Sequence, residues 1–324
     1  MQKDENSEPL RPSRILFTGS KEALSGKVTK LFEDAPESEA KPYWEIPEEH
    51  KLIPKADPAT VERIKSKINA TSFSAYLEDP ANFWLSKVLG LSSEDHDGGE
   101  LSAAAFGNMI HAVMEAFARP HLGKDRKDEP VESLTNELRS DFARLIESHV
   151  AEKFGNNPED SVRLQKETAL ARLLSFAPHQ AELWNQGWVI HSVETKLPDA
   201  IIEGVTIGVR YDRLDYRVVG ENKEWRVFDY KTAATPDSIT NAHYGKSPEG
   251  ATDFTFKKKK ADGEFSTMRW RNMQMPVYYE CLQSILKLNE KNTLIPCYIS
   301  LPADTKKTKV DTWDDYPQQH GEAL

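Results

Sequence analysis

The chain has 324 residues, of which 38% are hydrophobic, and this composition supports a sizeable core in one large domain or two small ones. The net charge of −10 argues against a nucleic-acid coat protein, which is usually basic, but it is compatible with a protein that gathers carboxylates around metal ions. No apolar run approaches the ~20 residues needed to span a membrane, the polar N-terminus is not a secretory signal, and two cysteines cannot form a disulfide framework, so we expect a cytoplasmic protein without membrane contact.

The N-terminal half of the chain is polar at first and then helical. Residues 1–57 are acidic and proline-containing, which predicts a segment that is partly extended or disordered, with ILFTGS as one short strand. Residues 58–188 predict a helical portion. The helices expected in it are 59–68, two within 71–91, 101–118, 131–153 and 160–186. Ser72 or Thr71 is expected to cap the first helix of 71–91, and Pro80 to break it.

After Trp188 the helical pattern gives way to alternation. The segments WVIHSVETKL, VTIGVRYDRLDYRVV and EWRVFDYKT predict three strands of an antiparallel meander with tight connections. A polar loop over 233–265 and a helix over 267–288 with Pro276 inside it are expected next, and LIPCYISL is the last predicted strand. Residues 189–324 thus predict an α/β core that forms one domain with the helical portion. The ending DDYPQQHGEAL carries no closing element, which suggests a piece of a longer protein.

The stretch RVFDYKT places an acid and a base on one face of a strand. Alternation puts Val227, Asp229 and Lys231 on one side, and Phe228 and Tyr230 on the other. Taken alone, Asp-x-Lys also fits a solvated strand face with a weak surface ion pair. The neighbouring segments decide whether more than that is present.

Three further side chains extend this group. Asp212 lies on the preceding strand, and pairing within a hairpin brings facing carboxylates within ~5 Å of each other. Glu194 lies on the strand before that, and His111 lies on the amphipathic helix FGNMIHAVMEAF. Oxygen ligands with one imidazole suit magnesium or manganese better than zinc, so the sequence predicts a site for one of these metals.

These residues also have simpler explanations. A histidine on an apolar helix face is usually a packing residue, and this reading stays open for His111. Glu194 could pair with Lys196 or with an arginine. Asp212 and Asp215 alternate out of phase, so one of them is expected to face solvent or to pair with Arg213.

Two features of the C-terminal half are equally open. Gln274 and Tyr278 are four residues apart on a predicted helix, which makes them neighbours on one face whatever their role. The run Lys257-Lys258-Lys259-Lys260 is either a solvated loop or a loop that contacts phosphates.

Five segments in order resemble the PD-(D/E)XK nuclease superfamily, and within it the RecB-like nuclease domains at the C-terminus of bacterial helicase–nuclease subunits such as RecB and AddB. They are TSFSAYLEDPANFWLSKVLGL, FGNMIHAVMEAF, the pair VETKL and GVRYDRLD, then FDYKT, and QMPVY. The resemblance covers residues 70–301. It implies an α/β (α+β) fold with a restriction-endonuclease-like core, in which helices flank a central mixed sheet, together with a helical N-terminal portion.

The same resemblance implies a Mg²⁺- or Mn²⁺-dependent DNA exonuclease that works with a helicase region or helicase subunit in DNA repair and recombination. Its metal ligands would be His111, Asp212, Asp229, the main-chain carbonyl of Tyr230 and, as a lesser candidate, Glu194. Lys231 would position the attacking water or stabilise the transition state, and Gln274 and Tyr278 would contact the DNA backbone or order the site.

One departure from the resemblance concerns cofactors. Asp79-Pro80 stands where many AddB-type and CRISPR-associated relatives have the Cys-Pro of an iron–sulfur cluster, and Cys281 and Cys297 lack the spacing that a cluster needs. We therefore expect no iron–sulfur cluster. Two alternatives to the exonuclease are a catalytically silent DNA-binding or scaffold module of a helicase complex, and a stand-alone nuclease of the phage or CRISPR type.

Overall fold

The computed structural model describes residues 20–32, 57–66, 68–91, 100–202, 204–250, 253–259, 263–289 and 291–316. The chain divides into two compact units, Met1–Leu52 and Ile53–Leu324. In the first unit, Lys21–Phe32 forms helix α1, within a segment whose sequence predicted no helix. The expected strand ILFTGS lies almost wholly outside the described residues.

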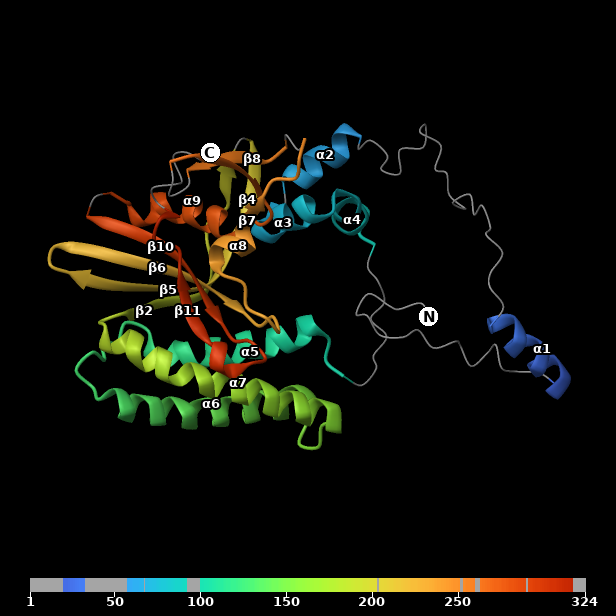
Figure 1. Cartoon of the computed structure of the whole chain (residues 1–324). Coiled ribbons are helices and arrows are strands. Elements are labelled where there is room, and N and C mark those ends of the chain that lie inside the picture. Colours follow the sequence, from blue (N-terminus) through green and yellow to red (C-terminus); the bar gives the residue numbers. More distant parts are fainter. Residues whose placement is uncertain are drawn as a thin grey trace. The chain divides into compact units, whose positions relative to one another are not determined.

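A five-stranded mixed sheet lies at the centre of the second unit (Figure 1). Its strands, in spatial order, are β11 Lys309–Thr312, β10 Asn292–Ser300, β6 Asn222–Lys231, β5 Arg210–Val219 and β2 Val189–Lys196. Strands β2, β5 and β6 form the predicted antiparallel meander, whereas β10 runs parallel to β6 and β11 antiparallel to β10. The alternation of β6 separates its side chains as predicted, because Phe228 and Tyr230 enter one core cluster and Val227 enters the other.

Three long helices cover one face of this sheet (Figure 1). They are α5 Ala103–Ala118, α6 Val131–Phe154 and α7 Asp160–Asn185, and all three were predicted. The side chain of Ser102 caps α5 by accepting a hydrogen bond from the Ala105 N–H. None of the helices in the described ranges is both long and apolar enough to cross a membrane.

The opposite face packs on helix α9, Gln274–Leu286, in a second core cluster that includes Leu214 and Tyr298. Two three-stranded sheets and several short helices complete this side. The sheets have the orders β1-β4-β3 and β7-β9-β8, with the bounds β1 Ile68–Asn69, β3 Ala200–Ile202, β4 Val205–Gly208, β7 Tyr244–Lys246, β8 Thr255–Lys259 and β9 Phe265–Trp270. The helices are α2 Pro58–Lys65, α3 Ala70–Glu78, α4 Pro80–Phe83, which continues into a π-helical turn at Trp84–Val88, and α8 Ile239–His243. This is the central mixed sheet flanked by helices that the resemblance implied.

The prediction of a polar loop over 233–265 is wrong. That segment contains α8, β7 and β8, and β8 pairs antiparallel with β9. The strand was not predicted because a lysine-rich composition is typical of a solvated loop. The ribbon is held instead by a cluster of Tyr244, Phe256 and Trp270, whose ring centroids lie 5.0–5.7 Å apart.

Several predicted boundaries are also corrected. The helix predicted over 267–288 begins only at Gln274, so Pro276 is its third residue, where the missing N–H has no intrahelical partner to lose. Asn69, not Ser72 or Thr71, caps α3, and Ser72 completes a capping box with it. The segment VTIGVRYDRLDYRVV forms two strands, and β11 follows the strand that was expected to be last.

The choice between Asp212 and Asp215 is settled by the two faces of β5. Asp215 turns towards the three long helices and forms a fully buried pair with Arg213, whose Nε and Nη2 donate to the carboxylate at 2.7 and 2.6 Å. A third bond from Arg213 reaches Oε1 of Gln180 on α7 at 2.6 Å. Asp212 therefore faces the other way, towards the site described next.

Candidate active site

Three acids form a row across three neighbouring strands. Glu194 lies on β2, Asp212 on β5 and Asp229 on β6, and the pairing registers of these strands place the three residues side by side. The exposed fractions of Asp212 and Asp229 are only 9% and 3%, so the two aspartates sit largely out of water. A row of carboxylates with so little solvent is costly without a cation nearby.

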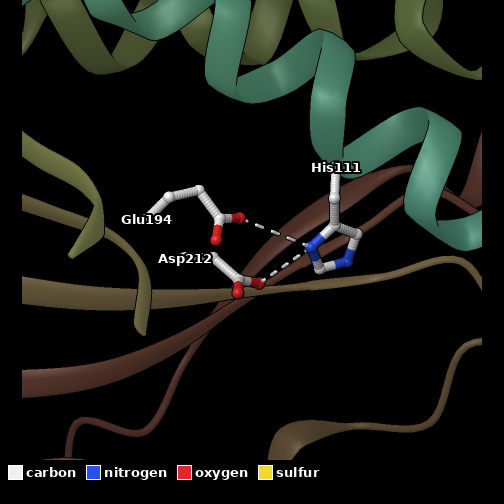
Figure 2. Close-up of side chains that lie close together, drawn as sticks. All are labelled: His111, Glu194 and Asp212. Carbon is white, nitrogen blue, oxygen red and sulfur yellow. Dashed lines mark ion pairs between the residues drawn. The ribbon is translucent and has the colours of Figure 1, made fainter. Parts of the chain in front are cut away.

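His111 reaches this row from helix α5 (Figure 2). Its Nδ1 lies 3.5 Å from Oδ2 of Asp212 and 3.9 Å from Oε1 of Glu194. Its Nε2 lies 3.2 Å from the main-chain oxygen of Tyr230. Neighbouring residues of α5, among them Ile110 and Met114, are buried in the core and fix the helix, so the ring is held at the row rather than used as packing alone.

The negative charge of the row is only partly compensated. Burial, and after it the charge of Asp229, raises the pKa of Asp212 to about 7, even though its Oδ2 accepts a hydrogen bond of 2.8 Å from the Tyr230 N–H. Burial opposes the charged form of His111, but Glu194, Asp212 and Asp229 outweigh it and raise the pKa of the imidazole. Both shifts favour a bound positive charge at this place, whether a proton or a metal ion.

Glu194 has an unusual backbone conformation. Its φ is 45°, in the left-handed region that non-glycine residues rarely adopt, and the ladder between β2 and β5 shifts register a few residues earlier. Its Oε2 also lies 2.8 Å from Nε of Arg210, so the predicted partnership with an arginine is present as well. The same carboxylate thus faces His111 with one oxygen and Arg210 with the other.

Asp229 and Lys231 lie on the same face of β6, as the alternation predicted. The Lys231 Nζ forms an ion pair of 2.6 Å with the buried Oδ2 of Asp229. The ammonium also donates to Oε1 of Gln274 at 3.2 Å and lies 4.8 Å from the ring centroid of Tyr298. The side chain of Lys231 is 33% exposed, so it reaches both the buried acid and solvent.

Gln274 and Tyr278 are linked to the row by hydrogen bonds. The Gln274 side-chain amide donates to Oδ1 of Asp229 at 2.6 Å and to the Tyr278 hydroxyl at 2.9 Å. That hydroxyl donates in turn to the main-chain oxygen of Arg210 at 2.9 Å. Both residues are buried, so their polar atoms are engaged with the protein and offer little surface to a ligand.

The donor set at the row fits a divalent metal ion. His111, Glu194 and Asp212 present ligand atoms within 4.8 Å of one another. Next to them are the buried carboxylate of Asp229 and the carbonyl oxygen of Tyr230. Carboxylate and carbonyl oxygens with one imidazole are suitable ligands for Mg²⁺ or Mn²⁺.

A second group of ligand-type side chains lies on the helical side of the unit, at His121, Glu137 and Asp141. Arg126 already occupies Glu137 with two hydrogen bonds of 2.8 and 2.7 Å. A cation at this place would have to displace the guanidinium. The two cysteines are separately buried, and burial raises the pKa of the Cys281 thiol to about 11 and that of Cys297 further, which keeps both protonated.

Three residues that support the site were missed in the sequence. Tyr298 on β10 lies opposite Asp229 in the parallel ladder, and its hydroxyl bonds to Nε2 of the buried His243 at 2.7 Å. No local pattern could identify them, because one lies in the segment expected to be a loop and the other depends on which strand pairs with β6. Arg210 did carry a signal, because it lies two residues before Asp212 and therefore on the same strand face.

Comparison with curated proteins gives no match. Comparison with protein families gives a match over residues 67–322, which includes the row of acids, His111 and Lys231. That family is described as nucleases, which use divalent metal ions, and the grouped acids and histidine of this site fit such an ion. The chain belongs to the PD-(D/E)XK nuclease superfamily.

Proposed function

We propose that this chain is a Mg²⁺- or Mn²⁺-dependent DNA exonuclease and that the acid row is its catalytic centre. The observation that carries the proposal is that three adjacent strands place Glu194, Asp212 and Asp229 side by side, with one imidazole next to the first two and a lysine next to the third. Two buried aspartates and a glutamate with a strained backbone lower the stability of the fold, so stability does not explain their presence. A cation that is bound for catalysis accounts for them.

The proposed metal ligands are His111, Asp212, Asp229 and the carbonyl oxygen of Tyr230, with Glu194 as a further candidate. A bound divalent ion would lower the pKa of a coordinated water and neutralise negative charge on the phosphate. The protein supplies the rest by holding its ligands in place. Asp212 is fixed by the Tyr230 N–H and Asp229 by the Gln274 amide, so neither carboxylate is free to turn away.

Lys231 is proposed as the residue that acts on the reacting groups. Its ammonium is oriented from three sides, by Asp229, by Gln274 and by the ring of Tyr298, while part of it remains open to solvent. A positive charge held in this way can position the attacking water or stabilise the charge that develops on the scissile phosphate. For Gln274 and Tyr278 the burial and hydrogen bonds favour ordering the site over contact with the DNA backbone.

The finer assignment rests on the order of the sequence motifs. We infer a RecB- or AddB-like nuclease that degrades DNA from an end and works with a helicase region or subunit in DNA repair and recombination. A scaffold that merely holds DNA would need neither the ordered lysine nor the row of buried acids. A stand-alone nuclease of the phage or CRISPR type differs from the main proposal in partner, not in chemistry.

The experiment compares the wild type with Lys231→Ala and Asp229→Ala on end-labelled single- and double-stranded DNA and on circular DNA, with Mg²⁺ and with Mn²⁺. We expect the wild type to degrade linear DNA from its ends and to spare circles. Lys231→Ala should still bind metal in calorimetry but should lose 10²-fold or more in rate, because a preorganised charge is removed. Asp229→Ala should lose metal binding and activity together.

Lys223→Ala is the matched control. This lysine lies on the same strand, also sits over aromatic rings at 4.0 and 4.4 Å, and is far along β6 from the acids. Its activity should equal that of the wild type. If the wild type cuts DNA under none of these conditions, the chain by itself is not a nuclease and the scaffold takes the place of the main proposal. If the wild type and Lys231→Ala cut at equal rates, the proposed role of Lys231 is wrong.

A further inference from the structure

A cavity of about 660 Å³ opens beside the acid row. Glu194 and Tyr278 form its boundary with the row, and its other polar lining includes Thr71 at the start of α3, Lys196 at the end of β2 and Arg210 at the start of β5. The space is therefore continuous with the candidate metal ligands through a shared residue. It has room for a nucleotide-sized ligand.

Two cations stand directly opposite each other on the wall of this cavity. Lys196 on β2 pairs with Arg210 on β5 in the ladder, and like charges in such cross-strand pairs are destabilising. Glu194 and Asp199 also line the cavity, so the formal charges of its lining residues balance. Any ligand that takes Glu194 away from this balance leaves the cavity positively charged.

Arg210 is placed to respond to such a change. Its main-chain oxygen is held by the Tyr278 hydroxyl, which is tied through Gln274 to Asp229, so its backbone is fixed relative to the acid row. Its side chain is 61% exposed and is bonded through Nε to Oε2 of Glu194 at 2.8 Å. A metal ion at the row would bind the Oε1 side of Glu194 while the Arg210 guanidinium pairs with Oε2, so the two would share the negative charge of one carboxylate.

We propose that this cavity binds the phosphodiester backbone of the substrate strand and that Arg210, with Lys196, is the phosphate-binding pair. A divalent ion bound to Glu194 would withdraw negative charge from this carboxylate and weaken its pair with Arg210, whose N–H groups would then donate to phosphate oxygens. Metal loading and DNA binding are in this way coupled through one ion pair. The inference rests on the proposed function, because it takes Glu194 as a metal ligand and DNA as the substrate.

The test measures binding of a fluorescein-labelled single-stranded oligonucleotide by anisotropy, without metal and with Ca²⁺, with the intact length of the DNA checked on a gel. We expect Ca²⁺ to strengthen binding to the wild type. Arg210→Gln should bind DNA roughly 10-fold more weakly with Ca²⁺, since a charged hydrogen bond to phosphate is lost, and should change little without metal. Lys196→Gln should also weaken DNA binding in the presence of Ca²⁺. Each substitution should reduce the slope of log K against log salt concentration by about 0.7 per lost phosphate contact.

Calorimetry adds a result that a purely structural role would not produce. Arg210→Gln should bind Mn²⁺ as tightly as the wild type or more tightly, because the guanidinium no longer offsets the negative charge of Glu194. Arg210→Lys should recover part of the DNA affinity. The matched control is Arg217→Gln, on the same strand, whose Nε forms an equivalent ion pair of 2.7 Å with Glu224 at the far end of the sheet; it should leave both affinities unchanged.

The outcomes separate the two proposals. If the wild type binds metal and cuts DNA but Arg210→Gln binds DNA as well as the wild type, or loses metal affinity, the phosphate site is wrong and the nuclease proposal stands. If the wild type neither binds metal nor cuts DNA, both proposals fail.

Discussion

Asp212 and Asp229 lie side by side at the end of two strands, and without a metal ion the folded protein has to hold both carboxylates out of water. Asp229 forms an ion pair with Lys231, whereas the cationic neighbour of Asp212 is the imidazole of His111, 3.5 Å away. The pKa of Asp212 is raised from 3.8 to about 7, first by burial and then by Asp229. Replacing Asp212 with asparagine removes the charge and keeps an oxygen to accept the hydrogen bond from the Tyr230 N–H.

The sign of the effect follows from proton linkage. Because the folded pKa lies above the unfolded one, the folded protein binds more protons between about pH 4 and pH 7, and the contribution of Asp212 to stability falls as the pH rises through this range. The difference between the folded and unfolded pKa values limits the destabilisation by the charged Asp212 to about 4 kcal/mol. Because Asp212 interacts with other titrating groups, we expect this destabilisation to be about 2–4 kcal/mol. In EDTA at pH 8, Asp212→Asn should therefore melt several degrees above the wild type, at roughly 2–4 °C per kcal/mol.

The assay is thermal unfolding in EDTA and in Mg²⁺ from pH 5 to pH 8. In EDTA the advantage of Asp212→Asn should shrink towards pH 5, where the wild-type carboxyl is already protonated. In Mg²⁺ the wild type should gain more stability than the variant, because the variant lacks a proposed ligand. Asp311→Asn serves as the control, since that carboxylate is compensated by Lys309 at 2.9 Å and accepts from the Ile239 N–H, and it should not be stabilising. Equal stability of wild type and Asp212→Asn in EDTA at pH 8 would refute the argument.

Two further predictions concern the support of the site. Asp215→Ala leaves the guanidinium of Arg213 charged and fully buried without its partner, so urea unfolding should show a loss of about 3–5 kcal/mol, and a loss under about 1 kcal/mol would contradict a buried pair. Tyr298→Phe keeps the ring near the ammonium of Lys231 and should retain activity within a few-fold. Tyr298→Leu removes the cation–π contact that orients the lysine and should lose roughly 5- to 30-fold in rate. Equal rates for the two variants would show that the ring is not needed.

The sequence by itself determined the local features of the site. Alternation in RVFDYKT was enough to put Asp229 and Lys231 on one strand face, and helical periodicity was enough to identify the helix that carries His111. The three long helices and the antiparallel meander followed from the same periodicities, because their contacts are between elements that follow one another in the chain. The order of the motifs added the superfamily, although no single motif was specific.

Tertiary structure decided whatever depended on partners distant in the chain. The parallel pairing of β10 with β6 brings Tyr298 next to Asp229, and the Tyr278 hydroxyl on α9 bonds to the backbone of Arg210. Neither contact can be predicted from the local sequence pattern. The strands within 233–265 were missed for the same reason, since their ribbon is stabilised by aromatic rings from different strands and not by the composition of the lysine run. Periodicity reports which side of an element is buried; which side chains meet there is set by the packing of the whole chain.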